Sequence, residues 1–326
     1  MLNIVYTVNN NFISQLGTSI CSVCENNLSE DIYFYVISYG ITFDNKEILV
    51  KFVQSYKKNI SIIELDDLTS YFDFEIDTSA WNPIVLARLI LPKLLPTNVE
   101  RVLYLDGDTM VRGNLHSLWK TDLQDKVIGA VVEPTANREH KNAIGIRDFE
   151  PYFNAGVLLI DMLQWKKTEA GKRIVDFYRE HNGKLFANDQ DAINGTLKNE
   201  IYPLPIEYNF CNSYRFYPYD TLVKIMKPCR FIGIDDYEKA IENPIIVHFL
   251  GEERPWRVGN KNTYTPEYVR YWNKTPWKEC GKEKGWENYF VVFNFFNIIM
   301  SKFPYCRYKI IDKLIPIFLK HRAKKK

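Results

Sequence analysis

The sequence lacks an apolar run that could cross a bilayer. Its longest apolar stretch, Tyr289–Met300, has 12 residues and contains two asparagines, whereas a membrane-spanning helix needs about 20 apolar residues. A signal-peptide pattern is also missing, because Met1 is followed at once by the strand-like segment Asn3–Thr7. These absences predict a cytoplasmic protein.

Glycine-rich nucleotide-binding loops are missing as well. No Gly-x-Gly-x-x-Gly follows the first strand-like segment, and the sequence contains no Walker-type loop. These absences argue against dinucleotide dehydrogenases and P-loop enzymes. The six cysteines include the pair Cys21-x-x-Cys24, but no second pair lies at zinc-finger spacing. We therefore interpret these two thiols as core or surface residues rather than metal ligands.

The chain has little excess charge of either sign, with a formal net charge of +2. The balance is uneven, because residues 302–326 contain nine lysines and arginines but one acid. This tail has a net charge of +8, which leaves −6 for residues 1–301. The main body therefore gives no indication of nucleic-acid binding.

Hydrophobic residues make up 46% of the 326 residues, enough for a sizeable core. Strand-like and helix-like segments alternate, which predicts an α/β fold with a Rossmann-like, mostly parallel sheet and helices on both faces. The expected strands are 4–7, 32–38, 60–65, 101–105, 127–132, 156–160 and 245–249, and the expected helices are 12–25, 47–57, 84–95, 162–180 and 189–198. The composition changes near Trp256, so we predict a first domain at 1–256 and a helical, basic and aromatic extension at 257–326.

Two carboxylates, Asp106 and Asp108, follow the expected strand 101–105 and are separated by Gly107. Open α/β sheets bind ligands at the carboxyl ends of their strands, and paired carboxylates suit a divalent cation. Gly107 leaves the chain free to turn so that both carboxylates converge. An ordinary solvent-exposed turn is the alternative for this motif taken alone.

A second set of candidate residues follows the expected strand 245–249. His248 ends an apolar segment, so its imidazole could reach the same crevice as the two aspartates. Gly251 lets backbone N–H groups approach a phosphate, and the Arg254 guanidinium can bind a phosphate with two hydrogen bonds. Two acids, an imidazole and an arginine in one cleft are typical of a metal–diphosphate site.

Together with further motifs, these residues make the chain similar to family 8 glycosyltransferases, which include bacterial lipopolysaccharide and capsule galactosyl- and glucosyltransferases and glycogenin. The resemblance spans roughly residues 3–256. It rests on Ala87-Arg88-Leu89, on residues 102–108, 153–157 and 188–191, on Leu204-Pro205 with Tyr208-Asn209, and on residues 248–256. It implies a GT-A catalytic domain at 1–256 and a UDP-sugar as donor.

The resemblance also implies roles for individual residues. Asp106, Asp108 and His248 match the family's metal ligands, with Mn²⁺ expected and Mg²⁺ as the alternative. The remaining matches are Thr7, Asn9 and Asn11 for the uracil and ribose, Arg88, Asn154, Asp189 and Gln190 for the donor sugar, and Gly107, Gly251 and Arg254 around the diphosphate. Two positions depart from the family pattern. The family commonly has an Asp where this chain has Asn9, and it usually has a Lys where this chain has Arg254.

Family members retain the anomeric configuration of the sugar. A double displacement needs a carboxylate nucleophile, but the matching position is Gln190, a neutral amide, and Asp189 is expected to hold sugar hydroxyls. We therefore expect front-face attack, in which the leaving phosphate takes the acceptor's proton. Glu133 matches an acceptor-side aspartate of the family, with a solvated loop acid as the alternative. Among the tryptophans, we regard Trp256 as the one candidate for stacking on a sugar.

The basic tail interleaves apolar residues with lysines at helical spacing. Ile310, Ile311, Leu314, Ile315, Phe318 and Leu319 alternate with Lys309, Lys313 and Lys320. This pattern fits an interfacial helix at an anionic membrane surface, which would place the protein at the inner face of the cell membrane. A basic helix packed on the catalytic domain is the alternative. Pro304 and Pro316 are expected to interrupt a continuous helix.

The predicted function is transfer of galactose or glucose from a UDP-sugar to a saccharide or glycolipid acceptor in bacterial surface polysaccharide synthesis. Two alternatives remain. One is a haloacid-dehalogenase-like phosphatase with Asp106 as nucleophile, although that motif normally follows the first strand and here lies about 100 residues into the chain. The other is a non-catalytic sugar-binding relative.

Overall fold

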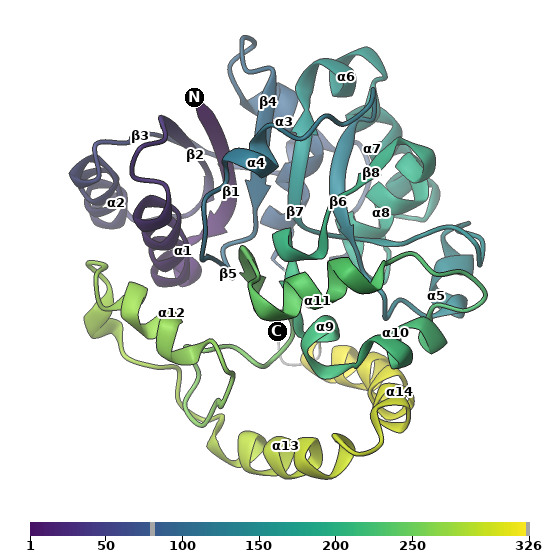
Figure 1. Cartoon of the computed structure of the whole chain (residues 1–326). Helices are drawn as coiled ribbons and strands as arrows, with labels where there is room; N and C mark the ends of the chain where they lie inside the picture. The colour runs from purple at the N-terminus through teal and green to yellow at the C-terminus, as the bar shows by residue number, and fades with distance from the viewer. Residues whose placement is uncertain (79–81, 324–326) are drawn as a thin grey trace.

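The main sheet of the protein is an α/β sheet of seven strands. The computed structural model describes residues 1–78 and 82–323, with side chains up to residue 317 (Figure 1). The strand order is β3-β2-β1-β4-β7-β6-β8. The strands are β1 (Leu2–Asn9), β2 (Ile32–Tyr39), β3 (Asn59–Glu64), β4 (Arg101–Leu105), β6 (Ile128–Val132), β7 (Phe153–Asp161) and β8 (Ile201–Pro203). Neighbours run parallel except β7, which is antiparallel to β4 and β6. The predicted mostly parallel sheet is confirmed.

The helices surround this sheet (Figure 1). They are α1 (Ile13–Asn26), α2 (Phe43–Ser55), α3 (Leu91–Leu94), α4 (His116–Trp119), α5 (Arg138–Ala143), α6 (Met162–Lys167), α7 (Ala170–Glu180), α8 (Asn188–Leu197), α9 (Asn212–Phe216), α10 (Tyr219–Ile225), α11 (Ile234–Glu242), α12 (Thr265–Trp272), α13 (Glu287–Met300) and α14 (Pro304–Ala323). α1 packs against β1 and β5, and α7 packs against α8.

Two of the expected helices are broken. The segment 84–95 is a 3₁₀ helix at Pro83–Ile90 followed by α3, because Pro92 has no N–H to continue the α-helical pattern. The segment 162–180 divides into α6 and α7 at Glu169, whose φ of 51° lies in the left-handed region. Left-handed backbone cannot continue a right-handed helix.

A second, three-stranded sheet lies at the carboxyl end of β4. Its order is β5 (Thr109–Val111), β10 (Ile246–His248) and β9 (Phe210–Cys211). β10 is antiparallel to β5 and parallel to β9, so His248 is paired with Thr109 on one side and with Cys211 on the other. This register brings residues from three distant parts of the sequence together.

Cys21 and Cys24 are buried on α1 as part of the hydrophobic core. Burial raises the pKa of the Cys24 thiol to about 12, so the thiol stays protonated at neutral pH. Of the two alternatives, core or surface, the structure shows that both cysteines are core residues.

The segment after Trp256 begins in the same core as the main domain. Tyr268 and Trp272 of α12 are buried, and so is Trp277, which lies against Gly17 of α1. α12, α13 and α14 then follow one another along the lower edge of the molecule (Figure 1). The predicted domain boundary at Trp256 stays a prediction.

The helices of the tail differ in part from the expectation. α13 ends at Met300 and α14 begins at Pro304, but α14 continues through Pro316, so the second predicted interruption is wrong. Proline removes one main-chain hydrogen bond, here to the Asp312 carbonyl, and the bonds on both sides keep the helix intact. Among the described residues, no helix has the length and hydropathy needed to span a membrane.

Candidate active site

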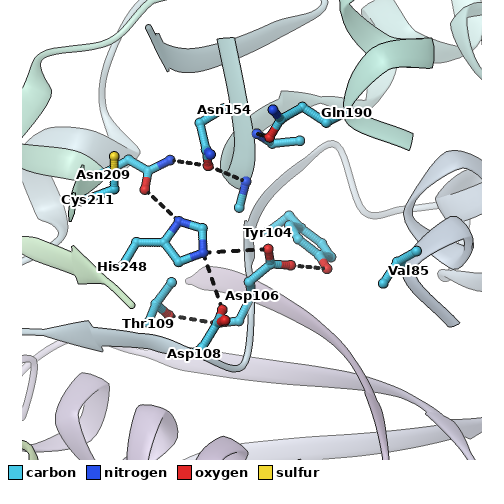
Figure 2. Close-up of polar contacts among 12 residues, drawn as sticks. Val85, Tyr104, Asp106, Asp108, Thr109, Asn154, Gln190, Asn209, Cys211 and His248 are labelled. Atoms are coloured by element: carbon cyan, nitrogen blue, oxygen red, sulfur yellow. Dashed lines mark hydrogen bonds and ion pairs between the residues drawn. The ribbon is translucent and has the colours of Figure 1, made fainter. Parts of the chain in front are cut away.

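The Asp106-Gly107-Asp108 turn begins where the buried strand β4 ends. The Asp106 N–H donates to the Gly156 carbonyl over 2.8 Å, and the Thr109 N–H donates to the Asp106 carbonyl over 3.1 Å. On the other side, the Phe249 N–H donates to the Asp108 carbonyl over 3.0 Å. Main-chain bonds from both sheets therefore fix the turn and aim its carboxylates at His248 (Figure 2).

His248 is buried at the carboxyl end of β10. Its Nε2 lies 3.2 Å from Asp108 Oδ1 and 3.8 Å from Asp106 Oδ2. One ligand atom from each of these three side chains, a carboxylate oxygen or an imidazole nitrogen, lies within 4.8 Å of the other two. The structure thus brings the three predicted metal ligands together (Figure 2).

A chain of amides fixes the orientation of the His248 ring. The Gly156 N–H donates to Asn154 Oδ1 over 2.9 Å, so this atom must be the oxygen. Asn209 Nδ2 donates to the same oxygen over 2.9 Å, and Asn209 Oδ1 in turn accepts from His248 Nδ1 over 2.9 Å. The neutral imidazole therefore carries its proton on Nδ1 and turns the Nε2 lone pair toward the two aspartates.

The three side chains fit a divalent cation. Among the described residues, His248 Nε2 is buried and has no hydrogen-bond partner of regular geometry. Burial by itself lowers the pKa of His248, but the carboxylates of Asp108 and Asp106 outweigh burial, so the pKa of His248 is raised. Burial by itself raises the pKa of Asp108, but the contact with His248 outweighs burial there too, so the pKa of Asp108 is lowered. Positive charge is therefore favoured between these groups. Two carboxylates and an imidazole match the ligand preference of Mn²⁺.

Arg88 joins the metal-ligand cluster to the predicted sugar pocket. Its buried guanidinium lies 2.8 Å from Asp106 Oδ1 and 2.9 Å from Asp189 Oδ2, and stacks 4.3 Å from the centre of the Tyr104 ring. Tyr104 also donates to Asp106 Oδ1 over 2.8 Å and contacts Thr7 Oγ1 at 2.7 Å. Burial raises the pKa of Asp189 to about 6 despite the opposing charge of Arg88.

Gln190 lies beside Asn154 at the amino-terminal end of α8 (Figure 2). Its Oε1 accepts from the Ala155 N–H over 3.0 Å, and its Nε2 donates to the Tyr152 hydroxyl over 3.0 Å. The structure therefore places all four predicted sugar-pocket residues around the carboxyl end of β4 and the start of β7.

Arg254 approaches the cluster from the segment after β10. Its guanidinium lies 3.6 Å from Asp108 Oδ2 and faces the rings of Phe12 and Trp256. Gly251 has a φ of 71°, which favours glycine. Trp256 is only 3% exposed and packs edge-on against Phe12. The idea that Trp256 stacks on a sugar is wrong, because the ring is buried, with Arg254 over it and Tyr268 packed beside it.

The predicted uridine residues lie at the end of β1. Asn9 is the last residue of the strand, and Asn11 is exposed in the following 3₁₀ turn, Asn10–Phe12. Phe12 lies 3.1 Å from where a Cβ on Gly107 would stand. The end of β1 therefore borders the aspartate turn.

Glu133 directly follows β6. Its Oε1 accepts hydrogen bonds from Thr135 Oγ1 over 2.6 Å and from Ser213 Oγ over 2.7 Å. Cys211 Sγ lies 3.9 Å from its Oε2, and Cys211 is the β9 residue paired with His248. Glu133 is thus a half-buried, hydrogen-bonded carboxylate and not a solvated loop acid.

Sequence reasoning missed Gly156 and the orienting role of Asn209. A Cβ on Gly156 would lie 2.0 Å from His248 Cε1 and 2.9 Å from Asp106 Oδ2. Both residues fall within the quoted motifs, yet their contacts with His248 depend on pairing between strands far apart in sequence.

A mostly parallel α/β sheet with two aspartates and a histidine beyond its strand ends is typical of the GT-A fold. The sequence matches the profile of glycosyl transferase family 8 over residues 3–260. The chain belongs to this family.

Relatives and solved structures agree with this assignment. General stress protein A of Bacillus subtilis (strain 168) is 29% identical over 285 residues, which cover 86% of this chain and 96% of that protein. Lipopolysaccharide 1,2-glucosyltransferase of Escherichia coli (strain K12) is 26% identical over 284 residues, covering 85% and 79%. The crystal structure of galactosyltransferase LgtC with donor and acceptor sugar analogs superposes with a TM-score of 0.72 at 24% identity, covering 85% and 99%. This last likeness shows the GT-A fold.

Proposed function

We propose that the protein transfers galactose or glucose from a UDP-sugar to a saccharide or glycolipid acceptor, with retention of configuration, in bacterial surface polysaccharide synthesis. The observation that carries this proposal is the Asp106, Asp108 and His248 cluster, which Arg88 links directly to Asp189. The names of the relatives support the reaction class, since they include a lipopolysaccharide glucosyltransferase. The LgtC structure, which contains donor and acceptor sugar analogs, supports a two-substrate site.

In this proposal Asp106, Asp108 and His248 hold Mn²⁺, or Mg²⁺ as the alternative. The bound cation supplies Lewis-acid stabilisation of the negative charge that develops on the departing diphosphate. Arg254 adds a second positive charge from the segment that begins at Gly251. Its planar fork can bind two phosphate oxygens with two parallel hydrogen bonds, whereas the ammonium group of a lysine acts as a compact point charge.

The donor lies between the end of β1 and the start of α8. Thr7, Asn9 and Asn11 contact the uridine, and Thr7 is supported by its 2.7 Å contact with Tyr104. The sugar is held by Arg88, Asn154, Asp189 and Gln190. Asp189 accepts sugar hydroxyls while its ion pair with Arg88 fixes the carboxylate.

Attack on the donor proceeds from its front face. Gln190 is a neutral amide, and both carboxylates flanking it are engaged: Asp189 with Arg88, and Asp191 with three donors. A carboxylate that accepts several hydrogen bonds is a poor nucleophile. The leaving phosphate therefore takes the acceptor's proton, and Glu133 orients the acceptor hydroxyl.

The acceptor side of the protein also faces a membrane in this proposal. α13 exposes Val291, Val292, Phe295 and Ile298, at spacings that place them on one helical face. The neighbouring α14 is held on the catalytic domain, because Arg307 is buried and donates to the Tyr217 hydroxyl over 2.8 Å. The start of α14 thus packs on the domain, whereas Leu314, Ile315 and Ile317 further along it are exposed. In this proposal the lipid contact falls mainly on α13.

UDP release from UDP-galactose and UDP-glucose, measured with and without Mn²⁺, tests the function. We expect metal-dependent release from one donor, enhanced by a saccharide acceptor, and a retained anomeric configuration in the product. Asp106→Asn and His248→Ala should each lower both activity and Mn²⁺ affinity, whereas the exposed Asp220→Asn on α10 should change neither. Release of phosphate from phosphomonoesters with Mg²⁺ would instead support the phosphatase alternative.

A further inference from the structure

Gln190 is held in one amide orientation by two opposed partners. The Ala155 N–H can only donate, so the Gln190 atom that faces it at 3.0 Å is the oxygen. The Gln190 Nε2 therefore faces the Tyr152 hydroxyl, 3.0 Å away. A 180° flip of the amide would place two donors together at Ala155.

Tyr152 can accept from Gln190 because its own proton is used elsewhere. Its hydroxyl lies 2.6 Å from Asp191 Oδ1, and an ionised carboxylate can only accept. Burial, reinforced by the charge of Asp191, raises the pKa of Tyr152 well above its ordinary value, so the hydroxyl keeps its proton. The tyrosine thus donates to Asp191 and presents a lone pair to Gln190.

Asp191 is completely buried and is held on both oxygens. The Ala187 N–H donates to Oδ2 over 2.8 Å, and His140 Nε2 lies 2.7 Å from Oδ1. His140 belongs to α5, and its side chain is 15% exposed at the outer end of the chain of contacts. Its ring also contacts those of Tyr152 and Phe186. A carboxylate bound in this way is a fixed acceptor, not a nucleophile.

We infer that His140, Asp191 and Tyr152 are positioning residues that hold the Gln190 amide in one orientation at the predicted sugar pocket. The direction of every hydrogen bond follows from the acceptor-only carboxylate at the centre. Without the His140–Asp191–Tyr152 chain, the Gln190 side chain keeps, among the described residues, only its hydrogen bond from Ala155, and it can rotate away from the reacting carbon. The catalytic consequence rests on the proposed function, but the orientation of Gln190 does not.

Substitutions along the chain test this inference. Tyr152→Phe removes the acceptor of Gln190, and His140→Leu removes a donor to Asp191, whereas His140→Gln retains an N–H near the position of Nε2. We expect kcat to fall about 10-fold in the first two, with KM for the donor changed less than about twofold, because misorientation affects the reacting geometry more than binding. His140→Gln should retain kcat within about twofold.

A matched control separates this role from stability. Tyr178→Phe also removes a buried tyrosine hydroxyl that bonds to α8, through Asn188 Oδ1 at 3.1 Å, but it lies outside the chain. It should lower the melting temperature about as much as Tyr152→Phe and leave kcat unchanged. Equal loss of kcat in both tyrosine variants, or wild-type kcat in Tyr152→Phe, would overturn the inference.

A second measurement needs no substrate. The chain has five glutamines, so ¹⁵N-glutamine labelling gives few side-chain amide signals, and Gln190→Glu identifies the relevant pair. We expect slow hydrogen exchange of the Gln190 amide in the wild type, Tyr178→Phe and His140→Gln, and exchange at least about 10-fold faster in Tyr152→Phe and His140→Leu. Unchanged exchange in these last two would refute the inference even if the protein transferred no sugar.

Discussion

At the residue scale, the position most sensitive to a single added atom is Gly156. It lies in β7 directly behind the metal-ligand cluster, and its carbonyl accepts from the Asp106 N–H. A Cβ there would lie 2.0 Å from His248 Cε1 and 2.7 Å from Nδ1, closer than any real contact. The absence of a side chain at this position therefore allows His248 and Asp106 to meet.

We predict that Gly156→Ala displaces His248 and lowers Mn²⁺ affinity by on the order of 10- to 100-fold, because the ring loses its orientation toward the aspartates. Calorimetric titration with Mn²⁺ measures the effect. Gly233→Ala is the matched control, since a Cβ there meets nothing within 4 Å. Wild-type affinity in Gly156→Ala would show that the ring tolerates the displacement.

Asp189 makes the stability of the protein depend on pH. Burial raises its pKa from 3.8 to about 6, so the folded state binds this proton more tightly than the unfolded state. As pH rises from about 4 to about 6, ionising the buried carboxylate therefore destabilises the fold. The Arg88 ion pair reduces this cost but does not remove it.

We predict that Asp189→Asn becomes more stable relative to the wild type as pH rises from 5 to 7. A pKa difference of one unit corresponds to about 1.4 kcal/mol, so the relative gain over this interval is about 1 kcal/mol. Urea denaturation in metal-free buffer at several pH values measures it. The difference should stay constant above about pH 7, and a constant difference from pH 5 upward would contradict the raised pKa.

At the element scale, α1 is shaped by what packs on it from the far end of the sequence. Gly17 lies in the middle of this helix, where alanine would ordinarily stabilise by about 1 kcal/mol. A Cβ on Gly17 would, however, lie 2.5 Å from two ring carbons of Trp277. The indole is buried and held by a 2.9 Å bond from its Nε1 to Asn45 Oδ1, so it cannot move aside freely.

We predict that Gly17→Ala lowers the free energy of unfolding by about 1–2 kcal/mol, because overpacking costs about 1–3 kcal/mol and exceeds the gain in helix propensity. Chemical denaturation of a double-mutant cycle tests the cause. In a Trp277→Leu background the same substitution should be neutral or stabilising. A loss of equal size in both backgrounds would mean that the indole is not responsible.

The strands of the site were more predictable than their contacts. β4 and the aspartates after it follow from an apolar run that ends in Asp106-Gly107-Asp108, and this local pattern predicts both strand and ligands. The roles of Gly156 and Asn209 could not be predicted, because they arise from the pairing of β7, β9 and β10. Likewise, Tyr152 and His140 lie outside any motif, and only the tertiary fold brings them to Asp191.

At the scale of the whole molecule, charge and exposed apolar surface lie toward the same end of the chain. Residues 302–326 carry a net charge of +8 against −6 for the rest, and α13 exposes Val291, Phe295 and Ile298 by 66–70%. α13 is also tied to the segment that carries Arg254. Arg257 bonds to Glu283 just before α13 and stacks 3.5 Å from the Trp286 ring. A membrane bound to α13 would therefore lie in a fixed relation to the active site.

We predict that the full-length protein binds vesicles containing anionic phospholipid and not vesicles of neutral phosphatidylcholine. Binding should weaken at least about 10-fold as salt rises from about 0.05 to 0.5 M, because screening shortens the reach of the tail's charge. Replacing Val291, Phe295 and Ile298 together by serine should reduce binding by about 100-fold or more, since each buried apolar side chain contributes about 1.5–3 kcal/mol. Co-sedimentation with vesicles measures both effects.

The control for that experiment replaces exposed apolar residues elsewhere, Leu28 and Phe149, by serine. These substitutions remove similar apolar surface outside α13, so vesicle binding should stay at the wild-type level. If the triple-serine variant binds as tightly as the wild type, α13 is not the lipid contact. If it instead converts a dimer into a monomer in sedimentation velocity without changing vesicle binding, the apolar face of α13 serves a second copy of the chain.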